Sequence, residues 1–241
     1  MTHPTGSKRL DQLLGGGIPG KSRALMYGPS YQGKEILSRQ VALHTLQGGH
    51  PVVMVLTNET AADCMAEMRK MDPEVESALS DGTLLFVDTY ANSIGVDEAH
   101  PNVEYVESAL DLNGITIALN KQQARVLGKH DEHLVIFDSV STLVLYSNAQ
   151  STFRFLQILV GKARQVGAAS LVLLDAGMHS DPEVQMFRHL CDGAIEIEAD
   201  GNKTRLRVTG LNSKRAAGWL DARFSETKFD VVGSLAAGRI Q

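Results

Sequence analysis

The sequence predicts an α/β fold, in which a mainly parallel, twisted sheet is flanked by helices and ends in an antiparallel hairpin. Five short apolar runs are continuous rather than alternating, which is typical of parallel strands buried on both faces. Segments with helical periodicity lie between the runs, and this alternation indicates a sheet covered by helices. Near the C-terminus apolar and polar residues alternate, as they do in a half-exposed antiparallel hairpin.

The predicted elements follow in order along the chain. The five buried strands are residues 22–28, 51–58, 83–90, 133–139 and 170–176. Asp181 is the expected N-cap for the last predicted helix, with Pro182 at its first helical position and Gly193 at its end. The predicted helices cover residues 35–48, 61–71, 102–128, 151–167 and 181–193.

The C-terminal part is predicted to form a hairpin from residues 194–200 and 203–211. Gly201 and Asn202 lie between them and suit a tight turn. Residues 227–233 are expected to add an edge strand. Because no internal repeat, low-complexity tract or linker interrupts the pattern, we expect one domain over residues 1–241.

Composition limits the classes of function. The chain has 241 residues, 43% of them hydrophobic and 21% charged, with a formal net charge of -5, which disfavours binding of nucleic acid through bulk charge. Cys64 and Cys191 match no metal-ligand spacing and are expected to be small buried side chains. No signal-peptide pattern or membrane-spanning apolar run is present, so we expect a cytoplasmic protein that does not insert into a membrane.

The stretch "GPSYQGKE", residues 28–35, is one letter short of the phosphate-binding Walker A pattern, or P-loop. Gly28, Gly33 and Lys34 match the pattern, whereas Glu35 replaces the usual Ser or Thr. In such a loop backbone N–H groups and a helix N-terminus bind phosphate, and the lysine reaches the β- and γ-phosphates. The sequence thus predicts an ATP or ADP site formed by Gly28, Pro29, Ser30, Tyr31, Gln32, Gly33, Lys34, Glu35 and Ile36.

Glu35 and Asp138 bear on Mg²⁺ binding. The missing hydroxyl at position 35 normally ligates the metal. Glu35 could bind the metal itself, repel the phosphates, or simply favour the helix N-terminus as an acidic first-turn residue. Asp138 ends an apolar strand, as the Walker B aspartate does, and is expected to hold the Mg²⁺ hydration shell.

The N-terminal "TGSKRLDQLLGGGIPG" (5–20), directly before the phosphate-loop strand, resembles the opening of the KaiC-like branch of the RecA-superfamily ATPases. That branch includes the cyanobacterial clock ATPase and many archaeal paralogues of the recombinases. The resemblance continues through "VLTNETAADCMAEM", "VIFDSVSTLVLY", "FLQILVGKARQVGAASLVLLDAGMH" and "LCDGAIEIEADGNKTRLRV". It implies a RecA-like core sheet, with nucleotide bound at the subunit interfaces of a ring or filament.

The sequence departs from this family in its hydrolytic residues. Relatives end the second strand with two adjacent glutamates that activate the attacking water, whereas this chain has Asn58 and Glu59, so Glu59 is the remaining candidate base. Relatives also insert a Lys and an Arg into the neighbouring subunit's site. The matching positions here are Gly210 and Asn212, with Lys214 and Arg215 just beyond, and loss of such a cation slows phosphoryl transfer by about 10³–10⁵-fold.

Other side chains carry weaker signals. His179 follows a predicted strand at the sheet edge where ligands bind in open α/β folds, although a loop histidine is usually solvated. His133 lies at the opposite edge and is expected to be structural. Ser139, Ser141 and Thr142 could sense a γ-phosphate or cap a helix. The stretch 203–215 holds five cations without interleaved aromatic residues, which favours a solvated strand face over a surface for DNA or another subunit.

We therefore expect a KaiC-like protein that binds ATP or ADP, with Mg²⁺, and hydrolyses it slowly or not at all. It would act as a regulatory or assembly subunit, in a homo-oligomer or with a related ATPase or regulatory protein. The main competing hypothesis is an active ATPase with Glu35 as metal ligand, Glu59 as base and Lys214 or Arg215 as the cationic finger. Two further hypotheses are a recombinase paralogue that binds DNA, which the charge pattern does not favour, and a nucleotide-free scaffold.

Overall fold

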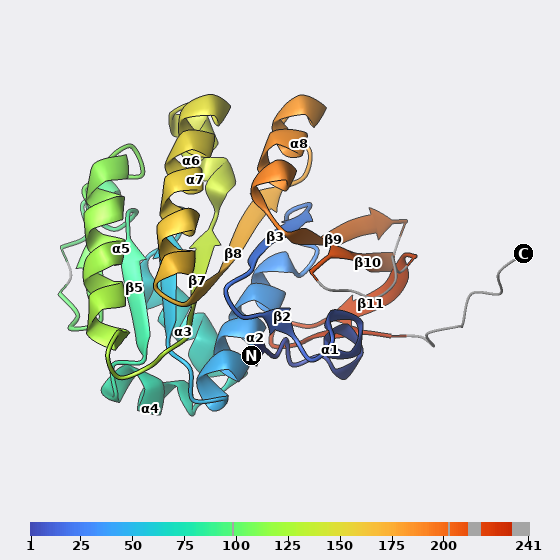
Figure 1. Ribbon diagram of the computed structural model, residues 1–241, viewed down its shortest axis with the longest axis horizontal. Coiled ribbons are helices and arrows are strands. Elements are labelled where there is room, and N and C mark those ends of the chain that lie inside the picture. The colour runs from blue at the N-terminus through green and yellow to red at the C-terminus, as the bar shows by residue number, and fades with distance from the viewer. Residues whose placement is uncertain (98, 202, 212–217, 233–241) are drawn as a thin grey trace, which may run out of the picture.

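The computed structural model describes residues 1–97, 99–201, 203–211 and 218–232. Its centre is a ten-stranded sheet in the order β12-β11-β10-β9-β3-β8-β7-β4-β5-β6, with helices on both faces (Figure 1). The strands from β9 to β6 run parallel to their neighbours, while β10, β11 and β12 pair antiparallel. The predicted mainly parallel sheet with an antiparallel C-terminal end is confirmed.

Each of the five predicted apolar runs overlaps a strand of this sheet, and β8 begins two residues before its run. Their residues are almost entirely buried, because helices cover both faces. The strands are β3 (Arg23–Gly28), β4 (Val52–Leu56), β5 (Leu84–Asp88), β7 (His133–Asp138) and β8 (Ala168–Asp175).

Four predicted helices lie where expected, namely α2 (Lys34–Gln47), α3 (Ala61–Met71), α7 (Ala149–Gln165) and α8 (Asp181–Leu190). Both predicted ends of α8 differ from the structure: the N-cap is wrong by one residue, and the helix ends at Leu190, since Gly193 begins β9. Ser180 is the N-cap, and its backbone N–H donates to the Glu183 side chain in a capping box.

The helix predicted over residues 102–128 is wrong in its first part. Residues Val103–Tyr105 form strand β6, which pairs with β5 at the sheet edge. Helix α5 begins only at Leu112 and ends at Val126, because the Asp111 side chain accepts from the Gly114 N–H and caps the helix there. The apolar positions before residue 111 thus belong to a strand and a loop.

Several short elements are not predicted by the sequence, since two to seven residues are too few to show a period. Two of them matter for the site: α6 (Val140–Tyr146), directly after β7, and β11 (Leu220–Phe224), beside the hairpin. The others are β1 (Thr2–His3), α1 (Lys8–Leu14), β2 (Ile18–Pro19), α4 (Val75–Ser80) and the 3₁₀ turn η1 (Asn92–Ile94).

The C-terminal hairpin is confirmed as β9 (Gly193–Asp200) and β10 (Lys203–Gly210). The predicted edge strand is present as β12 (Phe229–Val231), but it pairs with β11, which separates it from the hairpin. Cys64 is buried as expected, whereas Cys191 is only partly buried.

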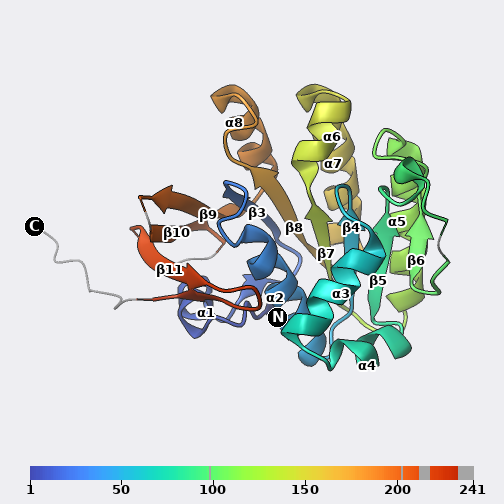
Figure 2. The ribbon, with the colours of Figure 1, turned by 180° about the vertical axis from the view of Figure 1, so that it is seen from behind.

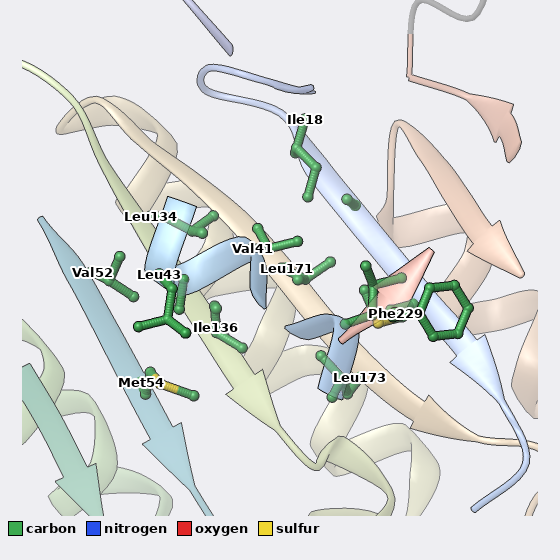
Figure 3. Close-up of a cluster of buried hydrophobic side chains, with 14 of the residues drawn as sticks. Ile18, Val41, Leu43, Val52, Met54, Leu134, Ile136, Leu171, Leu173 and Phe229 are labelled. Carbon is green, nitrogen blue, oxygen red and sulfur yellow. The ribbon is translucent and has the colours of Figure 1, made fainter. Parts of the chain in front are cut away.

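The core has two layers, one on each side of the sheet. Helices α5, α6, α7 and α8 cover one face in Figure 1, and α2, α3 and α4 cover the other in Figure 2. Figure 3 shows Val41 and Leu43 of α2 packed over Leu134, Ile136 and Leu171 of the sheet. None of the helices in the described ranges is long and apolar enough to cross a membrane.

Helix α2 also ties the two ends of the chain together through the buried Gln40. Its Nε2 donates to the backbone oxygens of Thr5, at 2.8 Å, and Phe229, at 3.1 Å. Its Oε1 accepts from the Phe229 N–H at 2.9 Å. The helix that follows the phosphate loop is thereby anchored to the N-terminal segment and to the edge strand β12.

Candidate functional site

The loop "GPSYQGK" joins the end of β3 to the start of α2. Gly33 is the N-cap of α2 and has a left-handed backbone with φ 83°, and Tyr31 has φ 61°. This strand–loop–helix arrangement is the one in which a glycine-rich loop binds phosphate, because free N–H groups at the helix start and the helix dipole favour an anion.

Side chains of the C-terminal strands pack closely against Gly33. A Cβ at this position would lie 2.8 Å from ring carbons of both Phe224 and Phe229, whose rings stack with centroids 6.3 Å apart. Next to it, the Thr204 hydroxyl donates to Gln32 Oε1 at 2.7 Å. The loop's shape therefore depends on β10, β11 and β12, and a side chain at position 33 does not fit.

Lys34 is almost fully buried, with 1% of its surface exposed, and its ammonium is engaged by acids. It forms an ion pair with Asp175 Oδ1 and lies 3.3 Å from Glu35 Oε1. Glu35 is thus turned toward the lysine. Asp175 is not among the predicted site residues, although its place at the end of an apolar strand parallels that of Asp138.

Asp175 sits beside the first residue of the loop, because β3 and β8 pair with Gly28 opposite Asp175. Its Oδ2 accepts from the Ser139 hydroxyl at 2.8 Å, and its Oδ1 accepts a long hydrogen bond from the Ser30 hydroxyl at 3.4 Å. Burial by itself would raise the pKa of Asp175, but the Lys34 ammonium and the serine hydroxyls outweigh it, and this pKa is below its ordinary value. The carboxylate is therefore ionised at neutral pH.

The serines and the histidine that follow these strands form one network with Asp175. The Asp175 N–H donates to Ser141 Oγ at 2.8 Å, and His179 Nε2 lies 2.8 Å from the same oxygen. Ser139 follows a cis peptide bond and caps α6, with its Oγ accepting from the Ser141 N–H. Thr142 lies one residue further along α6 and is partly exposed.

Asp138 ends β7 and is 3% exposed. Burial raises its pKa from the ordinary 3.8 to about 7, and the nearby Glu59 adds to the rise, while Arg39 and Lys34 oppose it. The carboxyl group is therefore partly protonated at neutral pH. A divalent cation would favour the ionised form, as a Walker B aspartate requires.

Glu59 is paired with Arg39, a residue of α2 that sequence analysis missed. Both Glu59 carboxylate oxygens accept from Arg39 Nη2, at 2.8 and 2.7 Å, and neither side chain is more than one-fifth exposed. Asn58, which stands where relatives have a second acid, is exposed. The one remaining candidate base therefore has a guanidinium as its partner.

The described residues contain no group of three or more His, Cys, Asp or Glu side chains arranged to hold a metal ion by themselves. Mg²⁺ in nucleotide sites is bound by one or two carboxylates together with phosphate oxygens and water. Asp138 and Glu35 fit that requirement as carboxylates near the loop, but only jointly with a bound phosphate.

Of the positions that correspond to the trans-acting cations of relatives, the structure describes the first. Gly210 is the last residue of β10, while Asn212, Lys214 and Arg215 lie outside the described residues. The other cations of the basic stretch are ion-paired. Arg207 binds Glu196 at 2.6 Å, Arg205 binds Asp200 at 2.7 Å, and Lys203 lies 3.9 Å from Asp221.

His133 lies at the start of β7, at the opposite edge of the sheet from the loop. It is fully buried, and its Nε2 is 2.8 Å from Gln123 Nε2. Burial lowers the pKa of His133 to about 4, so the ring is neutral at physiological pH. This placement agrees with the structural role expected for it.

The chain is similar to several known proteins. The family model described as "ATPase: KaiC" matches residues 3–215. A UPF0273 protein of Aeropyrum pernix is 28% identical over 81% of this chain and 77% of its own length. The archaeal flagellar ATP-binding protein FlaH of Methanocaldococcus jannaschii is 26% identical over 56% of this chain and 51% of that protein.

The fold has a close counterpart among solved structures. A KaiC-like protein from Pyrococcus horikoshii superimposes with a TM-score of 0.77 at 16% identity, covering 97% of this chain and 99% of that one. This similarity supports the RecA-like arrangement of the sheet. The match to the family model, which covers most of the chain, shows that this chain belongs to the KaiC ATPase family.

Proposed function

We propose that this protein binds ATP or ADP together with Mg²⁺, hydrolyses ATP slowly or not at all, and acts as a regulatory or assembly subunit of an oligomer. The observation that carries the proposal is the contrast between the phosphate loop and the candidate base. The loop keeps its glycines and its buried lysine, while both oxygens of Glu59 accept from Arg39.

Nucleotide binding is supported by the loop and by the family. Gly33 begins α2 in the backbone conformation that a phosphate loop needs, and Lys34 is buried at its end. The family is one of ATPases, and its relative FlaH is named an ATP-binding protein. Backbone N–H groups of residues 28–36 other than Pro29, which has none, would hold the phosphates together with the Lys34 ammonium, and Asp138 would hold the metal.

Slow hydrolysis is supported by the contacts of Glu59. Both of its carboxylate oxygens accept from Arg39 Nη2, whereas a general base must direct an oxygen at the water that it activates. Asn58 supplies no second carboxylate, and Glu35 supplies no hydroxyl for Mg²⁺. Each change removes part of the machinery that cleaves phosphate, while the glycines of the loop and Lys34 are kept.

A regulatory or assembly role follows from binding without turnover. Nucleotide bound at the loop would stabilise one arrangement of the subunits, and the free energy would come from binding alone. DNA binding by the β9–β10 hairpin is not favoured, because Lys203, Arg205 and Arg207 all face acids of the same chain.

The test combines calorimetry with a phosphate-release assay on the wild-type protein and Lys34→Ala. ATP and ADP are titrated with Mg²⁺ and with EDTA, and sedimentation is compared with and without nucleotide. We expect measurable heat that Lys34→Ala abolishes, a change in sedimentation, and turnover far below about 1 s⁻¹. Absence of heat and of any thermal shift would refute binding. Lys34-dependent turnover of about 1 s⁻¹ would instead support the active ATPase.

A further inference from the structure

The donors that surround the phosphate loop converge on one carboxylate. Lys34 of α2, Ser30 of the loop and Ser139 after β7 all direct a donor group at Asp175, which ends β8. The lysine and Ser30 share Oδ1, and Ser139 donates to Oδ2. Two segments far apart in the sequence, the phosphate loop with the start of α2 and the residue after β7, thus present their N–H and O–H groups to the same anion.

In this arrangement the charge of the Lys34 ammonium is already balanced by carboxylates of the same chain. Its side chain is 1% exposed and therefore has no access to other partners unless a ligand enters the loop. Glu35 places a second carboxylate oxygen 3.3 Å from the ammonium. One buried cation thus faces two acids, and an incoming phosphate meets their negative charge at the lysine.

We propose that Asp175 is an internal competitor of the nucleotide phosphates, so that nucleotide binds in the loop only by displacing the Asp175 carboxylate from Lys34. This inference rests on the proposed function, since it describes how the same site is regulated. Ligands that carry phosphate compete with Asp175 for Lys34, whereas a nucleoside without phosphate does not.

Displacement of Asp175 also changes the network behind it. The Asp175 N–H donates to Ser141, and His179 contacts the same hydroxyl just before α8. The His179 ring in turn lies against Phe187 of α8, with centroids 6.4 Å apart. A carboxylate that moves when phosphate enters the loop therefore alters the contacts at the start of α8.

The test replaces Asp175 by Asn and, separately, by Ser, which removes the charge in two ways. The matched control is Asp192→Asn, because Asp192 also forms an ion pair with a β3 residue, Arg23, but at the opposite end of that strand. ATP, ADP, inorganic pyrophosphate and adenosine are titrated into each protein with Mg²⁺ present. The thermal stability of each nucleotide-free protein is measured in parallel.

Both Asp175 variants are expected to bind ATP, ADP and pyrophosphate about tenfold more tightly or better, the factor expected for one hydrogen bond to a charged group. Adenosine binding and the Asp192→Asn variant should show no gain. The nucleotide-free Asp175 variants should also melt at lower temperature, because the buried Lys34 loses its ion pair with Asp175.

The outcomes separate the two proposals. Tighter phosphate binding in the Asp175 variants, including binding seen only there, supports the inference. Equal or weaker binding in variants that still fold overturns it, while wild-type binding leaves the proposed function standing. If neither the wild type nor any Asp175 variant binds a phosphate ligand, the proposed function fails and the inference fails with it.

Discussion

Replacing Asp138 with asparagine is expected to raise the free energy of unfolding at alkaline pH. This gain over the wild type should shrink as the pH falls. Asp138 is buried, and its pKa is raised from 3.8 to about 7 in the folded protein. The folded state thus keeps a proton that the unfolded chain loses near pH 4. Ionising the buried carboxyl costs free energy, so the wild type loses stability as the pH rises from about 4 to 7.

The size of the effect follows from this shift. Each unit of pKa difference is worth about 1.4 kcal/mol, so three units set a ceiling of roughly 4 kcal/mol at pH 8. Between pH 5 and pH 8 the linkage relation gives about 2.5 kcal/mol for this one group. Asparagine has nearly the same shape and does not titrate, so its advantage over the wild type should grow by that amount.

The assay is urea unfolding followed by circular dichroism at pH 5 and pH 8, with EDTA present and without nucleotide. Glu226→Gln serves as the control, because Glu226 is an exposed acid on the loop between β11 and β12. Its removal should leave the pH dependence unchanged. If the wild-type and Asp138→Asn curves stay parallel within about 0.5 kcal/mol, burial does not raise the pKa of Asp138 and the reasoning is wrong.

Two further predictions concern Gly33 and His3. Gly33→Ala should lower the free energy of unfolding by about 1–3 kcal/mol and weaken nucleotide binding, since an added Cβ meets Phe224 and Phe229. Gly49→Ala is the control, because Gly49 has a similar φ of 80° but lies in open space, so it shows the backbone strain without the clash. Equal losses of stability in both variants would contradict this explanation. Burial lowers the pKa of His3 to about 4, below the ordinary 6.5, so its contribution to stability is present above pH 6.5 and is lost as the pH falls. His3→Leu should remove about 2 kcal/mol of the loss between pH 7 and pH 4.5, and unfolding curves with the wild-type pH dependence would refute this.

The sheet could be predicted because its strands are buried on both faces and therefore read as continuous apolar runs. Strand β6 could not be predicted, because its three residues, Val103–Tyr105, come shortly before helix α5 and contribute apolar positions that resemble those of the helix. The position of Asp111 as a cap, which separates the two, becomes evident only from its hydrogen bond to Gly114. Short elements are specified by their tertiary contacts more than by local pattern.

Those residues of the candidate site that belong to a local sequence pattern could be predicted. Those that are brought together only by the order of the strands in the sheet could not. The loop and Asp138 are recognisable from sequence, since each follows an apolar run with a known arrangement of residues. Asp175 has no motif, and its contact with Lys34 exists because β8 lies between β3 and β7 in the sheet. The pairing of Arg39 with Glu59 likewise depends on how α2 packs beside the end of β4.

The buried amide of Gln40 has a consequence for the order in which the chain folds. Its partners, Thr5 and Phe229, are 224 residues apart, so both ends of the chain must arrive before this amide is satisfied. Contacts of such long sequence separation form slowly, because the entropy of closing the loop precedes their gain. We therefore expect the phosphate loop, which rests on the same C-terminal strands through Gly33, to acquire its final shape late, after the central strands have assembled.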